Sequence, residues 1–215
     1  MCQRSNRKKL RLVLVNLRQV CHTELRRPNM SEEVLVMANL EIICGDITTL
    51  HVDGLVLPAH KHYTRSRGLS AQVFDIAGPE LVTACSALGK SHTSDTRVTA
   101  APNLIAQYLI HTVTPLWSSG DFGGASSLDL LEQCYKNSIQ LALEQGIKRI
   151  AFPALGTGTN KTPHSIAAHI GLTTIYKHKD QFEELIICLH SEFARNTWQD
   201  GYDTHIKNHD IAQAS

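Results

Sequence analysis

The chain has 215 residues, 42% hydrophobic and 19% charged, with a formal net charge of +1 at pH 7. This length and balance are typical of a soluble globular protein with one substantial core and about 30 residues to spare. Its early apolar run is interrupted by Arg11, Asn16 and Arg18, which excludes a transmembrane span and argues against a signal peptide. The six cysteines are scattered, without a Cys-x-x-Cys pair, so we expect buried thiols, a cytoplasmic location and no structural zinc site.

Charge is distributed unevenly along the chain. Residues 1–29 contain eight Lys and Arg against the single acid Glu24, which gives this segment +7, whereas the remainder carries −6. A basic arm of this kind can bind nucleic acid or an anionic membrane. The competing interpretation is a poorly ordered leader, which a translation start at Met30 or Met37 would leave out of the protein. We therefore expect residues 1–37 to form a poorly ordered basic extension, with nucleic acid as the candidate partner of residues 1–29.

Regular hydrophobic spacing begins near residue 38 and alternates between strand-like and helix-like runs. The expected order is strand 40–43, strand 52–59, helices over 69–88 with a break at Gly78-Pro79, strands 97–101 and 107–114, helix 126–145, strand 149–155, helix 163–178, strand 184–190 and a last helix from about 191. This alternation predicts a three-layer α/β/α sandwich with a mixed, mostly parallel central sheet. We place this domain at residues 38–200 and a C-terminal tail at 201–215.

Residues 152–163 contain a candidate anion site. An apolar strand end runs into a loop with Gly156 and Gly158, and Pro163 suits the first position of the helix that follows. Glycines let a ligand approach the backbone, and the free N–H groups at a helix start attract an anion. The segment is therefore a candidate phosphate-binding loop, although an ordinary strand-to-helix connection uses the same residue types.

Three loops follow expected strand ends: Gly45-Asp46, the segment from Pro58 to Gly68, and the segment from Gly156 to Thr162. In open parallel sheets, ligands bind beyond the carboxyl ends of the strands. The three loops are therefore expected to line one crevice.

Several short runs occur in a fixed order along residues 39–190. They are Gly45-Asp46-Ile47-Thr48, Val52-Asp53, Ala77-Gly78-Pro79-Glu80-Leu81, Ile110-His111-Thr112-Val113 with Pro115, Cys134-Tyr135 with Ser138, Ala151-Phe152-Pro153-Ala154, and Thr157-Gly158 with Pro163. Each run is weak evidence alone. Together, at these intervals, they resemble the macro domain, an α/β module that binds ADP-ribose, over essentially the whole folded part.

The resemblance implies a role for each loop. The Asp46 carboxylate would accept a hydrogen bond from the adenine amino group, and the Ile47 backbone N–H would also meet the base. A turn or cap role is the alternative for Asp46. The second diphosphate loop would contain Gly156, Thr157, Gly158 and Thr159, with Asn160 where the family usually has an aromatic on the distal ribose. In the first loop, the ligand-binding positions are Ala59, Gly68 and Leu69.

The first loop departs from the family pattern at positions that matter for hydrolysis. In hydrolytic members an Asn orients the distal ribose and an Asp positions the attacking water, and these positions hold His60 and Ser70 here. Histidine can act as a general base and serine can hold a water, so both are catalytic candidates. Three glycines of the family are also lost, and Arg65 and Arg67 in their place are either solvated or paired with diphosphate oxygens.

The sequence leaves three functions open. The first is a module that binds free or protein-linked ADP-ribose with weakened or lost hydrolysis. The second is a mono-ADP-ribosyl hydrolase or O-acetyl-ADP-ribose deacetylase that uses a rebuilt site with His60 and Ser70. The third is a macro fold that no longer takes ADP-ribose and binds nucleic acid through its basic arm. No cofactor is expected, and the His60-x-His62 pair lacks a third metal ligand at sensible spacing.

Overall fold

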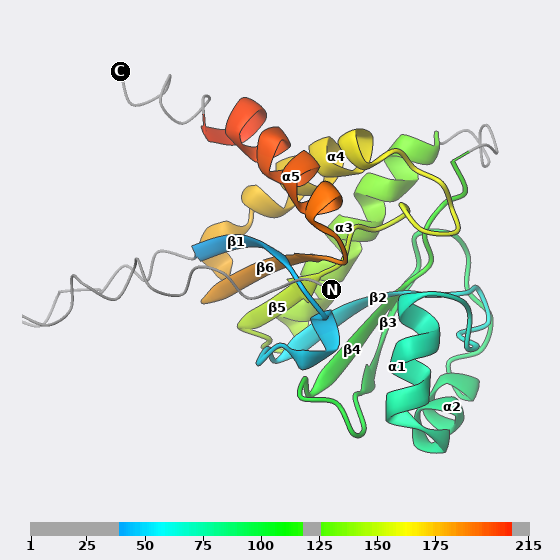
Figure 1. Cartoon of the computed structure of the whole chain (residues 1–215). Coiled ribbons are helices and arrows are strands. Elements are labelled where there is room, and N and C mark those ends of the chain that lie inside the picture. Colours follow the sequence, from blue (N-terminus) through cyan, green and yellow to red (C-terminus); the bar gives the residue numbers. More distant parts are fainter. Residues whose placement is uncertain (1–38, 118–125, 208–215) are drawn as a thin grey trace, which may run out of the picture. The chain divides into compact units, whose positions relative to one another are not determined.

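Six strands form one sheet in the order β1-β6-β5-β2-β4-β3. The computed structural model describes residues 39–117 and 126–207 (Figure 1). The expected extension at 1–37 and the last residues of the expected tail therefore lie outside the described part. The strands are β1 (Asn39–Cys44), β2 (Gly54–Pro58), β3 (Thr96–Ala100), β4 (Tyr108–Thr112), β5 (Arg149–Phe152) and β6 (Glu184–Leu189).

The sheet is mixed and mostly parallel, as the sequence predicts. Parallel pairing joins β1 to β6, β6 to β5, β5 to β2 and β2 to β4, and β3 runs antiparallel to β4. In this register Cys44 pairs with Leu189 and Pro58 pairs with Thr112. The carboxyl ends of five neighbouring strands therefore lie at one edge of the sheet.

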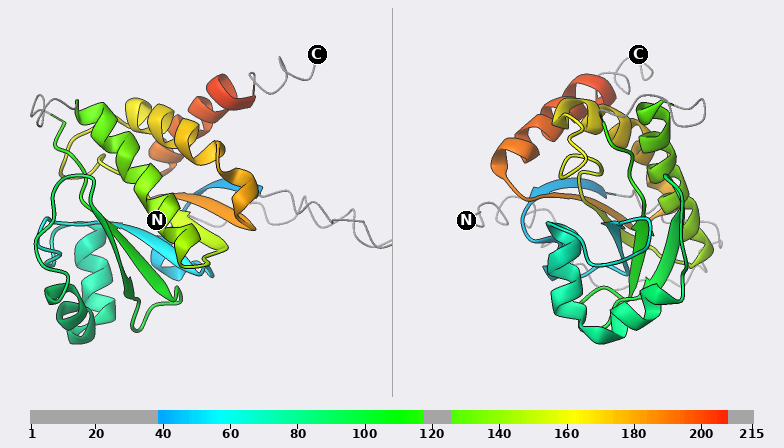
Figure 2. Two further views of the ribbon diagram at one scale, coloured as in Figure 1. Left: turned by 180° about the vertical axis from the view of Figure 1, so that it is seen from behind. Right: turned by 90° about the vertical axis from the view of Figure 1, so that its right-hand side faces the viewer.

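Helices cover both faces of the sheet, which confirms the three-layer prediction (Figure 2). The α-helices are α1 (Leu69–Ala77), α2 (Pro79–Ser86), α3 (Ser127–Glu144), α4 (His164–Tyr176) and α5 (Glu192–Tyr202). Two short 3₁₀ helices, η1 (Ile47–Thr49) and η2 (Lys179–Gln181), and a π-helical turn, η3 (Asp203–Lys207), complete the described elements. Buried side chains of α1 and α2 pack in one core, and those of α3, α4 and α5 pack in another.

Local chemistry sets the helix boundaries close to their expected places. Gly78, at a φ of +72°, separates α1 from α2, and Pro79 begins α2. Ser126 caps α3 in a capping box with Asp129. The strand expected at 149–155 is shorter than predicted and ends at Phe152, because the following proline has no N–H for the ladder.

The expectation of buried thiols is only partly correct. Cys85, Cys134 and Cys188 are free and buried, and burial raises the pKa of Cys188 to about 12. Cys44 does not fit the expectation, because it is only half-buried. No helix within residues 39–117 and 126–207 has the length and hydropathy that crossing a membrane requires.

Candidate functional site

The loop after β1 presents a carboxylate that its neighbours hold in place. Asp46 is the N-cap of η1, and this cap role leaves its part in ligand binding a prediction. Its Oδ1 accepts from the Thr48 N–H at 2.9 Å and from the Thr48 hydroxyl at 2.6 Å. Its Oδ2 accepts from Nε2 of Gln72, on α1, at 2.8 Å. A carboxylate has about four acceptor positions, so this exposed side chain keeps about one for a further donor.

Two more groups adjoin Asp46. Ile47 is buried, and its backbone N–H donates to no acceptor among the described residues. Gln72 is exposed and also donates to the Thr48 hydroxyl at 3.4 Å. Gln72 was absent from the expected site because the sequence gives no sign that this turn of α1 faces the loop after β1.

His190 is a second residue that sequence reasoning missed. The Gly45 N–H donates to the Leu189 carbonyl at 2.9 Å, so His190 leaves β6 beside the residue that precedes Asp46. Its exposed ring lies 6.4 Å, centroid to centroid, from that of His164 at the start of α4. Burial, and to a smaller extent His190, lowers the pKa of His164. The sequence prediction placed His190 inside the strand 184–190, whereas β6 ends at Leu189 and His190 lies just beyond the carboxyl end of the strand.

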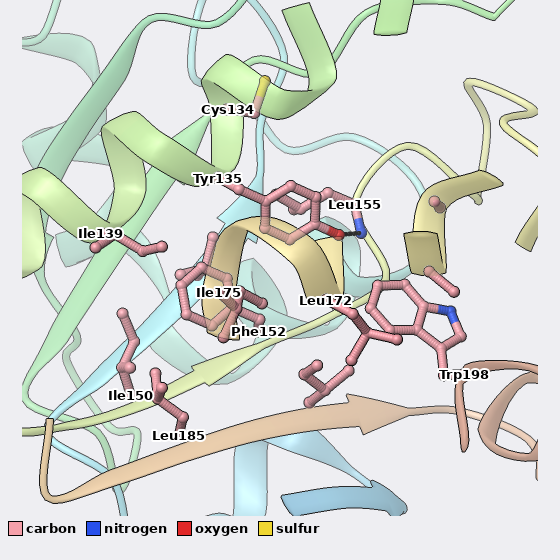
Figure 3. Packing of buried hydrophobic residues seen from close by; sticks show 14 of the residues in the cluster. Cys134, Tyr135, Ile139, Ile150, Phe152, Leu155, Leu172, Ile175, Leu185 and Trp198 are labelled. Carbon is pink, nitrogen blue, oxygen red and sulfur yellow. Dashed lines mark hydrogen bonds between the residues drawn. The ribbon is translucent and has the colours of Figure 1, made fainter. Parts of the chain in front are cut away.

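The loop after β5 depends on one glycine conformation. Gly156 has a φ of +80°, and a Cβ there would lie 2.8 Å from the Thr162 hydroxyl oxygen. The Leu155 N–H donates to the Tyr135 hydroxyl of α3 at 3.1 Å (Figure 3). Thr162 closes the loop by donating its N–H to the Gly156 carbonyl at 3.0 Å. The loop is therefore anchored at both ends, and only glycine fits the first turn without strain.

The middle of this second loop leaves backbone donors unused. Within the described part of the chain, the N–H groups of Gly158, Thr159 and Asn160 donate to no acceptor. A Cβ on Gly158 would have no atom within 4 Å. Helix α4 begins at His164, one residue after its Pro163 N-cap, so its positive dipole end lies just beyond these donors. Successive free N–H groups at a helix start suit an anion with several oxygens.

Asn160 does more than occupy the second loop. Its side-chain Nδ2 donates to the Thr114 carbonyl and to the Thr114 hydroxyl, both at 2.8 Å. Its backbone carbonyl accepts from the Trp117 N–H at 2.9 Å. These bonds tie the second loop to the segment after β4. The residue in the expected ribose-packing position is therefore a link between two loops.

The first loop is held from beneath by a buried aromatic. Tyr63 is 1% exposed and has a φ of +54°, which is unusual for an aromatic residue. Its hydroxyl is hydrogen-bonded to Ser91, and its ring and that of His111 form a T-shaped pair with centroids 5.8 Å apart. Burial lowers the pKa of His111 to about 4, and its Nε2 lies 2.9 Å from the Thr99 hydroxyl. The conformation of this loop, which lacks three of the family's glycines, is therefore stabilised by burial and hydrogen bonding.

The two catalytic candidates have different environments. Ser70 is 4% exposed, and its hydroxyl accepts the Ser66 N–H at 3.1 Å, so it closes the loop. His60 is exposed, and its Nδ1 lies 3.4 Å from both the His62 N–H nitrogen and the Thr64 hydroxyl. No described contact joins His60 to Ser70.

Other side chains of the first loop face partners of their own. Arg65 makes a bidentate pair with Asp75 of α1, at 2.7 and 2.8 Å, so this guanidinium is already engaged. Gly68 has a φ of +60° and is the N-cap of α1. The rings of His60 and His62 lie 5.5 Å apart, centroid to centroid.

Across residues 39–117 and 126–207, no three His, Cys, Asp or Glu side chains gather where they could hold a metal ion.

Comparison with known proteins identifies the family of this chain. The family model for the macro domain matches residues 56–171. A macro domain-containing protein of Chlorobaculum tepidum is 35% identical over 79% of this chain and 96% of its own. An O-acetyl-ADP-ribose deacetylase of Enterobacter cloacae is 36% identical over 65% of this chain and 78% of its own.

Solved structures give the same result. The Oceanobacillus iheyensis macrodomain with ADP superposes with a TM-score of 0.74 at 27% identity, over 81% of this chain and 95% of that chain. A variant of the same macrodomain, solved with ADPR, also has a TM-score of 0.74, at 27% identity over 80% of this chain and 96% of that chain. This chain belongs to the macro domain family.

Proposed function

We propose that the protein binds ADP-ribose, free or attached to a protein, and that its hydrolytic activity is weakened or lost. The base would lie at Asp46 and Ile47, and the diphosphate on the loop from Gly156 to Asn160. The remaining expected ligand-binding residues, Ala59, Gly68 and Leu69, would contact the ligand from the first loop. The solved macrodomain with ADPR supports this ligand class.

The observation that carries the proposal is the run of N–H groups from Gly158 to Asn160, which have no acceptor among the described residues and which shortly precede α4 in the sequence. A diphosphate offers several oxygens to such donors, and the helix dipole adds to the attraction. The Asp46 carboxylate, with about one acceptor position left, suits the amino group of adenine. Both features follow parallel strands that end at the same sheet edge.

Weak hydrolysis is inferred from the first loop. Ser70 is buried and its hydroxyl already accepts the Ser66 N–H, so it is poorly placed to hold a water for attack. The His60 side chain is exposed on the loop, and its Nδ1 makes only long contacts, at 3.4 Å, with described residues. The alternative is a hydrolase that acts through His60 and Ser70 in a rearranged loop, and the similarity to an O-acetyl-ADP-ribose deacetylase keeps it open.

Titration calorimetry with ADP-ribose tests the binding. We expect saturable heat for the wild type and a loss of about 1 to 3 kcal/mol in binding free energy for Asp46→Ala, the scale of a hydrogen bond to a charged group. An Asp46→Ala variant that binds as tightly as the wild type would show that the base lies elsewhere.

Turnover of a mono-ADP-ribosylated protein, and of O-acetyl-ADP-ribose, separates the binding module from the enzyme. The binding proposal expects release no faster than with buffer alone. Enzymatic release that His60→Ala or Ser70→Ala abolishes would establish the hydrolase instead.

Nucleic-acid binding through residues 1–29 and a cytoplasmic location are separate predictions that rest on the sequence. Removal of residues 1–37 should abolish any binding to an oligonucleotide and leave ADP-ribose binding unchanged. An equal loss of both would contradict this division of roles.

A further inference from the structure

Two exposed basic segments, one in the first loop and one around Lys90, are joined into one surface. The Ser91 N–H donates to the Lys61 carbonyl at 2.8 Å, and the Ser91 hydroxyl is hydrogen-bonded to Tyr63. The buried ring of Tyr63 holds this junction against the sheet. Lys61 takes part in this backbone hydrogen bond, and Lys90 directly precedes Ser91 in the sequence. The backbones of Lys61 and Lys90 are therefore fixed relative to each other. We call Lys61, His62, Lys90 and His92, all exposed, the basic rim.

The basic rim has little negative charge near it in sequence. Residues 59–74 and 81–94 together contain four of the chain's 21 Lys and Arg and none of its 20 Asp and Glu. Of the four, Arg65 is paired with Asp75. Asp95 approaches the ring of His92 at 3.7 Å.

The lysines of the rim are not neutralised by ion pairs. Among the described residues, Lys61 and Lys90 form no ion pair, and the same holds for Lys161 and Lys177, whereas Lys136, Lys148 and Lys179 each lie within 3.1 Å of a carboxylate oxygen. Like charges held together without partners create a local positive potential that attracts an anionic partner.

The rim continues directly from the candidate site. His60 follows β2 at the sheet edge and precedes Lys61. If the proposed function is correct, the distal ribose lies at His60, and a protein that carries ADP-ribose leaves the site at this end. We propose that the basic rim docks an acidic segment of a polypeptide that carries ADP-ribose, so that the protein prefers modification sites flanked by Asp and Glu. This inference rests on the proposed function.

The size of the rim favours a peptide over nucleic acid. Proteins that track a nucleic-acid backbone neutralise about six to ten phosphates. The rim offers two lysines that form no ion pair among the described residues, and the ring of His92 already has Asp95 at 3.7 Å, so the rim suits one or two carboxylates next to a modified residue. Its place beside the ribose end also suits a partner that is already bound through ADP-ribose.

The test compares two synthetic peptides that carry one ADP-ribose each and differ only in their flanks, Asp and Glu in one and Asn and Gln in the other. Fluorescence anisotropy at low salt should show tighter binding of the acidic peptide by about fivefold to twentyfold, and this preference should shrink as salt is added. In the Lys61→Gln/Lys90→Gln double variant the two peptides should bind equally. Free ADP-ribose should bind this variant within about twofold of the wild type.

The control is Lys148→Gln/Lys177→Gln, which removes two exposed lysines at the opposite edge of the sheet and should keep the preference. Equal binding of both peptides by the wild type would overturn the inference. The inference would also be overturned if the rim variant lost as much affinity for free ADP-ribose as for the peptides. Displacement of the acidic peptide from the wild type by a single-stranded oligonucleotide would overturn it as well. A wild type that binds no free ADP-ribose would instead contradict the proposed function, since that titration does not involve the rim.

Discussion

The two ligand loops at the sheet edge are built in opposite ways. The second loop is shaped by the backbone, with Gly156 in a left-handed conformation and, at its centre, three N–H groups that have no acceptor within residues 39–117 and 126–207. The first loop is shaped by side chains, with Tyr63 buried beneath it and Ser70 and Arg65 bonded to their neighbours. A loop that uses its polar groups internally has fewer of them for a ligand. We infer that phosphate recognition depends on the second loop and that the chemistry expected of the first loop is reduced.

The largest effect is expected at Gly158. A glutamate there would place a negative side chain over the unpaired N–H groups, so we expect ADP-ribose affinity to fall at least about 100-fold. The fold should survive, since a Cβ at this position meets no atom within 4 Å. Calorimetry gives the affinity, and thermal unfolding checks the fold. The matched control is Gly158→Ala, which should bind nearly as well as the wild type, and intact affinity in Gly158→Glu would show that the phosphates lie elsewhere.

Gly156→Ala should reduce stability. The left-handed conformation costs a non-glycine residue about 1 to 2 kcal/mol, and the new Cβ would lie 2.8 Å from the Thr162 hydroxyl oxygen. We expect the free energy of unfolding to fall by about 3 kcal/mol in urea denaturation. Gly45→Ala, at a turn residue with no atom within 4 Å of the added Cβ, is the control. A Gly156→Ala protein as stable as the control would mean that the second loop does not depend on this glycine.

The buried histidine of β4 that packs against Tyr63 predicts a pH dependence. Burial lowers the pKa of His111 from its usual 6.5 to about 4, so the folded protein disfavours the charged ring. The stability is unaffected above pH 6.5 and falls as pH drops from 6.5 towards 4, by about 2 kcal/mol at pH 4.5. Urea denaturation at pH 7 and pH 4.5 measures this loss. His111→Gln cannot titrate and should lose less, and an identical pH dependence in the variant would show that His111 is not responsible.

The smallest effect is expected at Gln72. Its Nε2 donates to Asp46 at 2.8 Å, so Gln72→Leu should loosen the carboxylate and weaken ADP-ribose binding about threefold. The preference for ADP-ribose over its hypoxanthine analogue, which has no amino group on the base, should shrink as well. Gln140→Leu changes an exposed helical glutamine remote from Asp46 and should have no effect. An unchanged base preference in Gln72→Leu would exclude a role for Gln72 in recognition.

The sequence predicts the fold well because hydrophobic periodicity and the glycine, proline and capping residues at element boundaries are local features. Gly78-Pro79 and Ser126 each mark a boundary that depends only on nearby backbone conformation, whereas the strand before Gly156 ends earlier than predicted, at Phe152. The site is harder to predict, because its contacts join distant segments. Gln72 reaches Asp46 across 26 residues, and Tyr63 reaches Ser91 across 28. His190 reaches the site through the pairing of β6 with β1, which single-strand patterns do not reveal.

A crystal structure with ADP-ribose bound tests the central claim most directly. We predict that the diphosphate oxygens lie about 3 Å from the backbone nitrogens of Gly158, Thr159 and Asn160, and that the adenine amino group lies at a similar distance from Asp46 Oδ2. The first loop should contact the distal ribose without closing over the diphosphate. A diphosphate held by the first loop and distant from Gly158 would contradict the account.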